Sequence, residues 1–362
     1  MAIATDLVDD DVARRRDDRR QSLFRRINRS APYLGAFGLG FLVPLLRMAA
    51  GDTIRPQLRE LWQSLGVPLA GIAVFIVLWA SLAPQVQTSL GAIPGPGDVV
   101  EQAVLLYEDH LAERGREAEF NADQEDRNAQ LIAEGQQDRV RWRAYTGRPT
   151  YFDQIATSLK TVALGFVLAT LLAVPLGIAC GLSRTVSGAL NPVIQMFKPV
   201  SPLAWLPIVT MVVSALYVEV WDPMPRSLVT SAITVTLCSL WPTLINTALG
   251  VSSVDRDLMN VGRVLRLSTR KTVTKLILPS AMPLIFTGMR LSLGVGWMVL
   301  IAAEMLAQNP GLGKFVWDEF QNGSSSSLSK ILVAVLTIGL IGFLLDRIMY
   351  ALQSAFTHSA TR

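Results

Sequence analysis

Long apolar stretches alternate with short charged segments along most of the chain. Four windows contain no charged residue, and each reaches the ~20 residues that a helix needs to cross a bilayer: 61–97, 161–183, 199–218 and 227–254. Two more follow, because 276–303 is interrupted only by Arg290, and 331–345 can be extended past Asp346 and Arg347 to Tyr350. The pattern predicts an all-α membrane protein with about six transmembrane helices.

A further apolar stretch, 31–46, precedes these windows. The residues before it are rich in arginine, and the loop 255–275 is also basic. Basic loops favour the cytoplasmic side of a membrane, and six crossings place both segments there. We therefore expect 31–46, which glycines and a proline interrupt, to lie along the membrane surface as an interfacial helix. The alternative is a true seventh span.

The amino-acid composition excludes several classes of protein. Hydrophobic residues make up 51% of the chain and charged residues 17%, which is too apolar for an ordinary soluble domain. The net charge of +4 comes from basic residues that flank apolar windows, so it does not indicate nucleic-acid binding. The two cysteines, Cys180 and Cys238, fall in different windows, and neither they nor the two histidines suggest a metal site.

Catalytic patterns are missing from the sequence. We find no phosphate-binding glycine loop, no histidine and cysteine pair at metal-ligand spacing, and no nucleophile beside a base. The chain is therefore not expected to be an enzyme or to need a cofactor. If it drives transport, another subunit must supply the energy.

The patterns divide the chain into four parts. Residues 1–60 form a cytoplasmic arginine-rich tail and the interfacial helix, and 61–97 form the first span. Residues 98–155 are hydrophilic, with ten acidic and seven basic residues between Glu108 and Arg148. We expect an extracytoplasmic pair of solvated helices there, with a specific binding role as the alternative. Residues 156–355 hold the other spans and the basic loop 251–280.

The basic loop predicts two short helices. The first covers 257–266 with Leu258, Val261 and Leu265 at helical spacing. Ser268 or Thr269 caps the second, at 270–276, which Pro279 ends. Such a rigid knob can dock into a cytoplasmic partner, whereas the alternative is a loop that only binds lipid headgroups. The candidate docking residues are Asn260, Val261, Gly262, Arg263, Arg266, Arg270, Leu278 and Pro279.

Polar residues inside the spans are candidates for a translocation path or gate. One face of the fourth span carries Thr236, Ser239, Thr243, Asn246 and Thr247. These side chains can line the route of a small hydrated anion or bond between helices; both interpretations remain open.

Two charged residues in the fifth span are further candidates. A charge inside the membrane is energetically costly and therefore usually has a function or a partner. Arg290 can attract an anion, or it can pair with a carboxylate or a helix end. We interpret Glu304, near the external end, as a structural or gate residue, since a carboxylate on an anion path would repel the solute.

The start of the third window contains two prolines around a tryptophan. Ser201, Pro202, Trp205 and Pro207 lie where prolines are expected to break or kink a helix. Backbone groups freed there must find partners or face a wet cavity, which makes the segment a candidate for the pathway or its gate. The alternative is a surface turn with Trp205 anchored at the membrane interface.

The spacing within 260–279 is that of the EAA loop of ABC importer permeases. Asn260 takes the Glu position, Val261 and Gly262 the two Ala positions, and Arg266 the Gly position, and Pro279 coincides with the final Pro. Further segments, 89–96, 199–207, 239–247, 285–290 and 302–306, also match. Together they resemble the permease subunit of nitrate-type ABC importers, in the group that carries nitrate, bicarbonate, cyanate, taurine and alkanesulfonates.

The resemblance implies a type I ABC importer permease fold in the bacterial inner membrane, with the N-terminus in the cytoplasm. It also implies a homodimer surrounded by lipid, separate ATPase subunits that hydrolyse ATP, and an extracytoplasmic solute-binding protein. Nitrate is the expected substrate. The alternatives are taurine or an alkanesulfonate, cyanate, bicarbonate or, in another class, a secondary anion carrier that works without ATP.

Overall fold

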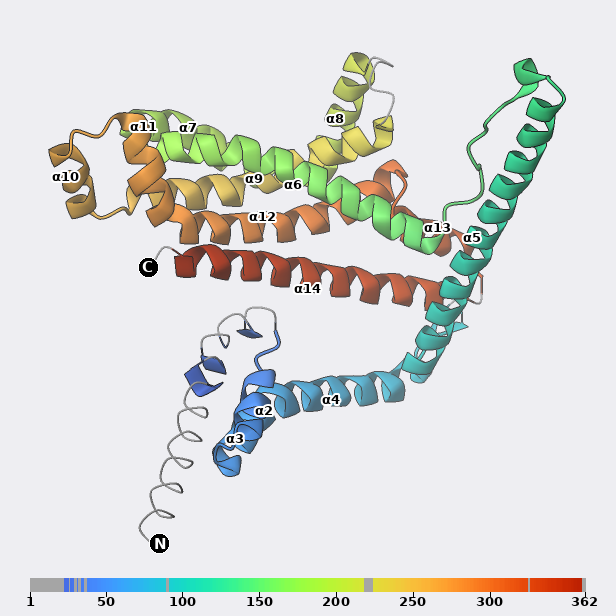
Figure 1. Ribbon diagram of the computed structural model, residues 1–362, viewed down its shortest axis with the longest axis horizontal. Helices are drawn as coiled ribbons and strands as arrows, with labels where there is room; N and C mark the ends of the chain where they lie inside the picture. The colour runs from blue at the N-terminus through green and yellow to red at the C-terminus, as the bar shows by residue number, and fades with distance from the viewer. Residues whose placement is uncertain are drawn as a thin grey trace, which may run out of the picture.

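The computed structural model describes residues 23–25, 27–28, 31, 34–35, 38–88, 91–217, 224–324 and 326–359 (Figure 1). The N-terminal arginine cluster, apart from Arg25, lies outside these residues, and so do Ser89 and Leu90 of the first matched segment. Within the described part, helices α6 (Tyr151–Leu182), α9 (Arg226–Ser252), α12 (Leu278–Ala307) and α14 (Ser327–Ser359) lie side by side; α6, α9 and α14 run in one direction and α12 runs in the other (Figure 1). We call the end with helices α10 (Arg256–Val264) and α11 (Thr269–Thr272) the loop end and the end with helix α5 (Pro96–Ala133) the arm end.

Five helices in the described residues are long and apolar enough to cross a membrane. They are Ile54–Gln85, which contains α4 (Val67–Leu82); α6 (Tyr151–Leu182); α9 (Arg226–Ser252); Thr269–Ala307, which contains α12 (Leu278–Ala307); and Ser327–Phe356 within α14 (Ser327–Ser359). A sixth span exists if α7 (Arg184–Phe197) and α8 (Pro202–Leu216), which meet at an angle of 102°, count as one.

The expected third span, 199–218, is therefore not one crossing helix. Helix α8 has 15 residues, which corresponds to roughly 22 Å at 1.5 Å per residue and falls short of the ~30 Å apolar layer. The chain bends between Phe197 and Pro202, where Ser201 caps the new helix and Pro202 is its first residue. A window of apolar composition cannot reveal such a bend.

Small residues bring α6 close to α9. They recur at every fourth position of α6, as Gly165, Ala169, Ala173, Gly177 and Gly181. A Cβ on Gly165 would lie 2.7 Å from a Val235 methyl, and one on Gly177 would lie 2.7 Å from the Leu244 carbonyl oxygen. In a membrane, where apolar burial drives little helix association, such close backbone contact is a main source of affinity between helices.

Helix α14 closes the bundle against α12. The indole Nε1 of Trp297 donates to the Ile338 carbonyl at 3.0 Å, and Gly342 leaves room for the ring. The main apolar core, which includes Val235, Leu300 and Ala334, lies among α9, α12 and α14. These contacts make α6, α9, α12 and α14 one packed unit.

Helix α4 stands apart from this unit. None of the apolar window in its span is buried within the chain, and Figure 1 shows the helix diverging from α14 toward the loop end. Only its arm end is attached, where Trp79 Nε1 donates to the Pro94 carbonyl at 3.1 Å. A short hairpin of β1 (Gln87–Thr88) and β2 (Gly91–Ala92) follows, so the predicted first span 61–97 ends near Gln85.

The segment before α4 does not contain the expected helix over 31–46. The chain turns at residues 38–41 and forms α2 (Leu42–Ala49) and α3 (Ile54–Leu61), each of eight residues. Gly38 has a φ of 76°, which favours glycine and ends any helix before it. A helix of eight residues spans about 12 Å and cannot cross a bilayer. The described residues of 31–46 thus contain no seventh span.

Residues 98–155 form one long helix and an extended return segment, so the expected helical pair is wrong. Helix α5 (Pro96–Ala133) crosses the arm end of the bundle and projects beyond it, and the chain returns along its side (Figure 1). We call α5 and the strap 140–150 the arm. Gln124 bonds both backbone groups of Arg143, and Asn128 Nδ2 donates to the Arg141 carbonyl at 3.0 Å. These amides satisfy the backbone of the strap, which needs no second helix.

The middle of the arm is held by a buried carboxylate. The side chain of Glu113 is 1% exposed, and it accepts a hydrogen bond from the Tyr145 hydroxyl at 2.8 Å and an ion pair from Arg116 at 2.5 Å. The bond to Glu113 raises the pKa of Tyr145 above its ordinary value. Nearer the bundle, Arg148 pairs with Asp109 and Arg114 pairs with Asp153. The charges that suggested solvated helices therefore join the strap to the helix.

Candidate functional sites

The loop between α9 and α12 forms a knob at the loop end. It contains α10 (Arg256–Val264), which Asp255 caps by accepting from Asp257 N at 2.9 Å, and α11 (Thr269–Thr272). Ser268 caps α11 by accepting from Lys271 N, as predicted. Both helices begin at a side chain that satisfies free backbone N–H groups, so local sequence determines the shape of the knob.

Arg266 has a left-handed backbone at the end of α10. Its φ is 47°, its N–H donates to the Arg263 carbonyl, and the N–H of Leu267 donates to the Gly262 carbonyl, both at 3.0 Å. This pair of bonds is the Schellman arrangement, which favours glycine at the left-handed position. Position 266 is where the EAA pattern has Gly, so the geometry gives a physical reason for that glycine.

Pro279 does not end the second helix of the knob, as the sequence had suggested. The chain continues as one helix from Thr269 to Ala307, and the five residues Val273–Ile277 before α12 form a π-helical turn. A proline inside a helix crowds the carbonyl four residues back. The wider π turn lies at that carbonyl, and the helix accommodates Pro279 without a break.

The outer face of the knob is apolar with a charged rim. Val264 is 82% exposed and Leu265 63%, whereas Leu258 is partly buried. Asn260, Val261, Arg263, Arg266 and Arg270 are also exposed; Gly262 is buried against Leu276, and Leu278 is partly buried. Exposed apolar side chains on a rigid element are typical of a protein-binding surface.

The polar stripe of α9 lies mostly between helices. Thr236 donates to the Gly165 carbonyl of α6 at 3.1 Å, and the Thr243 hydroxyl bonds to the Ser292 hydroxyl of α12 at 2.7 Å. Ser239 and Thr247 are fully buried, and their hydroxyls have no hydrogen-bond partner in the described structure. Asn246 is only partly buried and donates to the Pro242 carbonyl. In a single chain, four of the five side chains thus face packed helices.

Glu304 lies at the arm end, buried to 1% exposure. Its carboxylate accepts from the Ser158 hydroxyl at 2.9 Å and from Gly313 N at 3.0 Å, and Ser158 accepts from Leu312 N at 2.9 Å. A Cβ on Gly311 would overlap the Glu304 carboxyl. The network joins α6, α12 and α13 (Leu312–Asn322), which is the structural role predicted as one alternative.

Arg290 pairs with Asp346 of α14. Its Nε and Nη2 both donate to the carboxylate, with Nη2 at 2.8 Å from Oδ2, and the ring of Tyr350 lies 5.4 Å from the guanidinium carbon. The carboxylate alternative for Arg290 is therefore realised. Arg290 and Glu304 do not contact each other, since their partners are Asp346 and Ser158.

Trp205 lies just after the bend between α7 and α8. Its ring packs against Phe197 at 5.6 Å, and its Nε1 is buried without a partner in the described residues. Ser201 Oγ accepts from Leu203 N, whereas Pro207 lies within α8 without ending it. Only one of the two prolines therefore marks a break.

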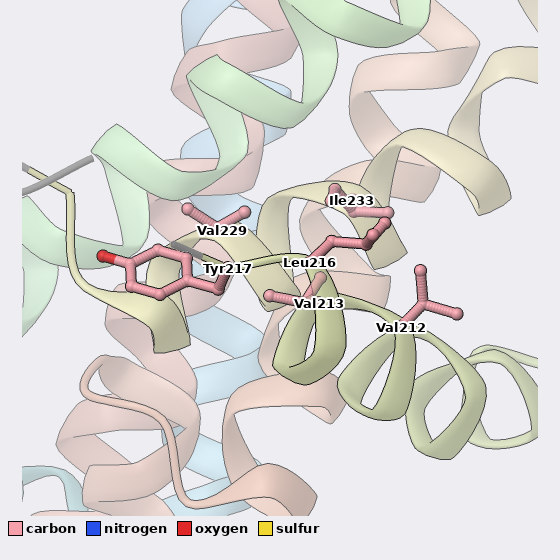
Figure 2. A pocket seen from close by; sticks show the side chains of 6 residues that line it. All are labelled: Val212, Val213, Leu216, Tyr217, Val229 and Ile233. Atoms are coloured by element: carbon pink, nitrogen blue, oxygen red, sulfur yellow. The ribbon is translucent and has the colours of Figure 1, made fainter. Parts of the chain in front are cut away.

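Two pockets flank α8. One is apolar, and Figure 2 shows it between α8 and the start of α9, with the Tyr217 hydroxyl pointing away from the valine, leucine and isoleucine side chains around it. The other, of about 570 Å³, has both polar and apolar side chains in its lining and lies at the arm end; we call it the arm-end pocket. Its lining includes Pro207, Thr210, Arg226, Thr230 and Asn309.

Sequence reasoning missed several of these partners. Ser158, Ser292 and Asp346 complete the sites of Glu304, Thr243 and Arg290, but each comes from another helix, far away in sequence. A signal existed only for Asp346, because it interrupts the last apolar window as Arg290 interrupts the one before.

Comparisons with known proteins agree with this architecture. The family profile described as "Binding-protein-dependent transport system inner membrane component" matches residues 173–358. The nitrate import permease protein NrtB of Synechococcus elongatus is 36% identical over 58% of this chain and 74% of its own length. The bicarbonate transport system permease protein CmpB of the same species is 34% identical over 79% and 87%, respectively. The taurine transport system permease protein TauC of Escherichia coli is 34% identical over 58% and 70%.

Proposed function

Because the chain belongs to the family of inner membrane components of binding-protein-dependent transport systems, which have the type I ABC permease fold, we propose that it is the permease subunit of an ATP-driven importer of a small anion. The observation that carries this proposal is the knob, with its exposed apolar face and its arginines. An ATPase subunit docks there. The knob then lies in the cytoplasm, the N-terminus lies on the same side, and the arm lies outside.

The continuous helix Thr269–Ala307 supports a mechanical role for the knob. Helix α11 is the first turn of this helix, so a displacement of α11 by the ATPase moves α12 as one rod. Helix α12 in turn packs on α9 and α14, through Ser292 and Trp297. ATP binding and hydrolysis outside this chain can thus change the packing of the spans.

We place the translocation path along Ser201–Pro207 and the partly buried Asn246. Thr236, Ser239, Thr243 and Thr247 are buried between helices and, together with Arg290 and Glu304, we assign them to holding the spans in place. The unburied span of α4 supports a homodimer, because a second copy can cover apolar surface that its own chain leaves open. Lipid covers the rest.

Nitrate is the substrate that we propose first, on the similarity to the nitrate permeases. Bicarbonate is the second candidate, because the alignment with CmpB extends over more of the chain. Taurine follows from TauC. An external solute-binding protein would select among these anions before they reach the spans.

Affinity purification of the tagged chain from native membranes, in mild detergent, tests the proposal. We expect an ATPase with a phosphate-binding loop to copurify with the chain. Proteoliposomes that contain this complex should import nitrate only when ATP and the binding protein are present. The variant Arg263→Glu/Arg266→Glu/Arg270→Glu should enter the membrane normally but lose the ATPase. A chain that moves nitrate in liposomes by itself, without ATP, would mean a secondary carrier.

A further inference from the structure

The arm-end pocket has a wall from each of three segments. Helix α8 contributes Leu206, Pro207, Thr210 and Ser214; the first turns of α9 contribute Arg226, Ser227 and Thr230; and the end of α12 and the turn after it contribute Ala307 and Asn309. Among the described residues of this lining, Arg226 is the one cation and there is no carboxylate. Its volume of about 570 Å³ is in the range of ~300–1,000 Å³ that is common for small-molecule sites.

The walls of this pocket are held by hydrogen bonds within and between its segments. Asn309 Nδ2 donates to the Ser231 hydroxyl at 2.7 Å and to the Ser227 carbonyl at 3.2 Å, which holds the turn after α12 against α9. Thr210 and Thr230 donate to the carbonyls of Leu206 and Arg226 within their own helices. The walls of the pocket are therefore preformed, and among the described residues no flexible loop is needed to complete them.

Arg226 has no such role in the walls. Its side chain is exposed, and within the described part of the chain no carboxylate lies within ion-pair distance of its guanidinium. Arg290, by contrast, forms an ion pair with Asp346. Arg226 also stands at the first turn of α9, where free backbone N–H groups add positive potential.

We propose that this pocket is a binding site for a small oxyanion, in which Arg226 is the residue that binds the anion and the exposed Ser214 hydroxyl, on the α8 wall, is a further donor. The inference rests on the proposed function, because it makes the pocket the first stop of the substrate after release at the arm end. A guanidinium presents planar pairs of donors that suit an oxyanion, and a cation in a concave polar surface concentrates anions from solution.

The two faces of α8 make the assignment specific. The residues at 206, 207, 210 and 214 line the arm-end pocket, whereas Val212, Val213 and Leu216 line the apolar pocket of Figure 2. The same helix therefore offers a matched pair of positions, one beside Arg226 and one away from it. Only the first should attract anions.

Charge-selective labelling of an introduced cysteine tests the site without requiring transport. Cys180 and Cys238 are first replaced by Ala, and Thr210→Cys is then made in the full-length chain. The purified permease is treated with two methanethiosulfonates of similar size, one carrying a sulfonate and one carrying a trimethylammonium group. We expect the sulfonate reagent to react roughly tenfold faster, and we expect millimolar nitrate or bicarbonate to slow it.

Charge variants identify the cation. Arg226→Gln should remove the preference for the negative reagent, Arg226→Lys should keep it, and Arg184→Gln, which removes an exposed arginine at the other end of the bundle, should leave it unchanged. Ser214→Cys provides a second position if Thr210→Cys disturbs the fold. Equal rates with both reagents at both positions, or no effect of Arg226→Gln, would overturn the inference.

Uptake separates this inference from the proposed function. In proteoliposomes with the ATPase and binding protein, Arg226→Gln should raise the KM for the anion at least several-fold while ATP hydrolysis stays coupled to the binding protein. Wild-type protein that imports no anion would refute the proposed function even if the labelling preference is present. Normal uptake kinetics in Arg226→Gln, with an active wild type, would refute the site alone.

Discussion

The guanidinium of Arg290 and the carboxylate of Asp346 face each other across α12 and α14, with Nη2 2.8 Å from Oδ2. Arg290 interrupts an apolar run alone, and Asp346 interrupts the last apolar run together with Arg347. Pairing therefore removes a cost of roughly 2.5–3.5 kcal/mol that either charge would carry alone near the centre of a bilayer.

We expect Asp346→Asn and Arg290→Gln each to lower the melting temperature of the purified permease, and the double variant to be more stable than either single variant. The reason is that a single change leaves one charge without its partner, whereas the double change leaves none. Thermal unfolding monitored by size-exclusion chromatography in detergent measures this. Additive losses in the double variant would show that the two residues do not interact.

Gly165 should not tolerate even a methyl group. Gly165→Ala places a Cβ 2.9 Å from the Ala232 carbonyl oxygen and 2.7 Å from a Val235 methyl, so α6 must move away from α9 at a cost of about 1–3 kcal/mol. Gly71→Ala on α4 is the matched control, because nothing lies within 4 Å of that position. Equal melting temperatures for the two variants would contradict the close packing of α6 and α9.

Arg266→Gly should make the knob more rigid. Glycine adopts a positive φ without the penalty of about 1 kcal/mol that a side chain brings, so amide exchange across 255–272 should slow by several-fold. Arg266→Ala removes the charge but keeps the strained backbone, and it should not slow exchange. If Arg266→Gly and Arg266→Ala exchange alike, the left-handed turn is not what limits the stability of the knob.

Glu304→Ala should destabilise the arm end more than Glu304→Gln. Alanine leaves the Ser158 hydroxyl and Gly313 N–H without an acceptor, at about 1–3 kcal/mol for each buried donor, whereas glutamine keeps one carbonyl oxygen. Protein yield in membranes and melting temperature provide the readout. A Glu304→Gln variant as unstable as Glu304→Ala would show that the negative charge itself is required.

Tyr145→Phe should release the strap from α5. The hydroxyl bond to Glu113 is lost, and trypsin should then cut faster at the exposed Arg141 and Arg143. Tyr107→Phe, an exposed tyrosine on α5, is the control. Because the pKa of Tyr145 is raised in the folded arm, the bond persists below pH ~10 and is lost as pH rises through the folded pKa. A strap equally resistant in both variants would contradict this role.

Most of the spanning helices could be predicted from sequence alone, because lipid allows few structures other than helices and their apolar side chains are directly visible. The exception at α7 and α8 has a local cause. Its bend lies at 198–201, at the edge of the predicted window 199–218, so that window contains only the 15-residue α8 and a few residues around it.

The contacts within the arm and the ion pair between Arg290 and Asp346 could not be predicted from the sequence for a different reason. Gln124 reads as a solvated helical residue until Arg143 returns beside it, 19 positions later. Asp346 lies 56 positions from Arg290. Hydropathy and periodicity describe neighbours in sequence, whereas these contacts depend on which helices lie together in space.

The π-helical turn Val273–Ile277 sets the angular register between the knob and the membrane. A π turn holds one residue more than an α turn over the same hydrogen-bonded length, and each residue of an α-helix advances the side-chain direction by about 100°. Removing one residue there would leave both helices intact yet turn the arginines of the knob by about a quarter of a circle relative to Ser292. The ATPase docked on the knob would then no longer be aligned with the spans, and transport would be uncoupled from ATP hydrolysis although the knob and the spans are each correctly folded.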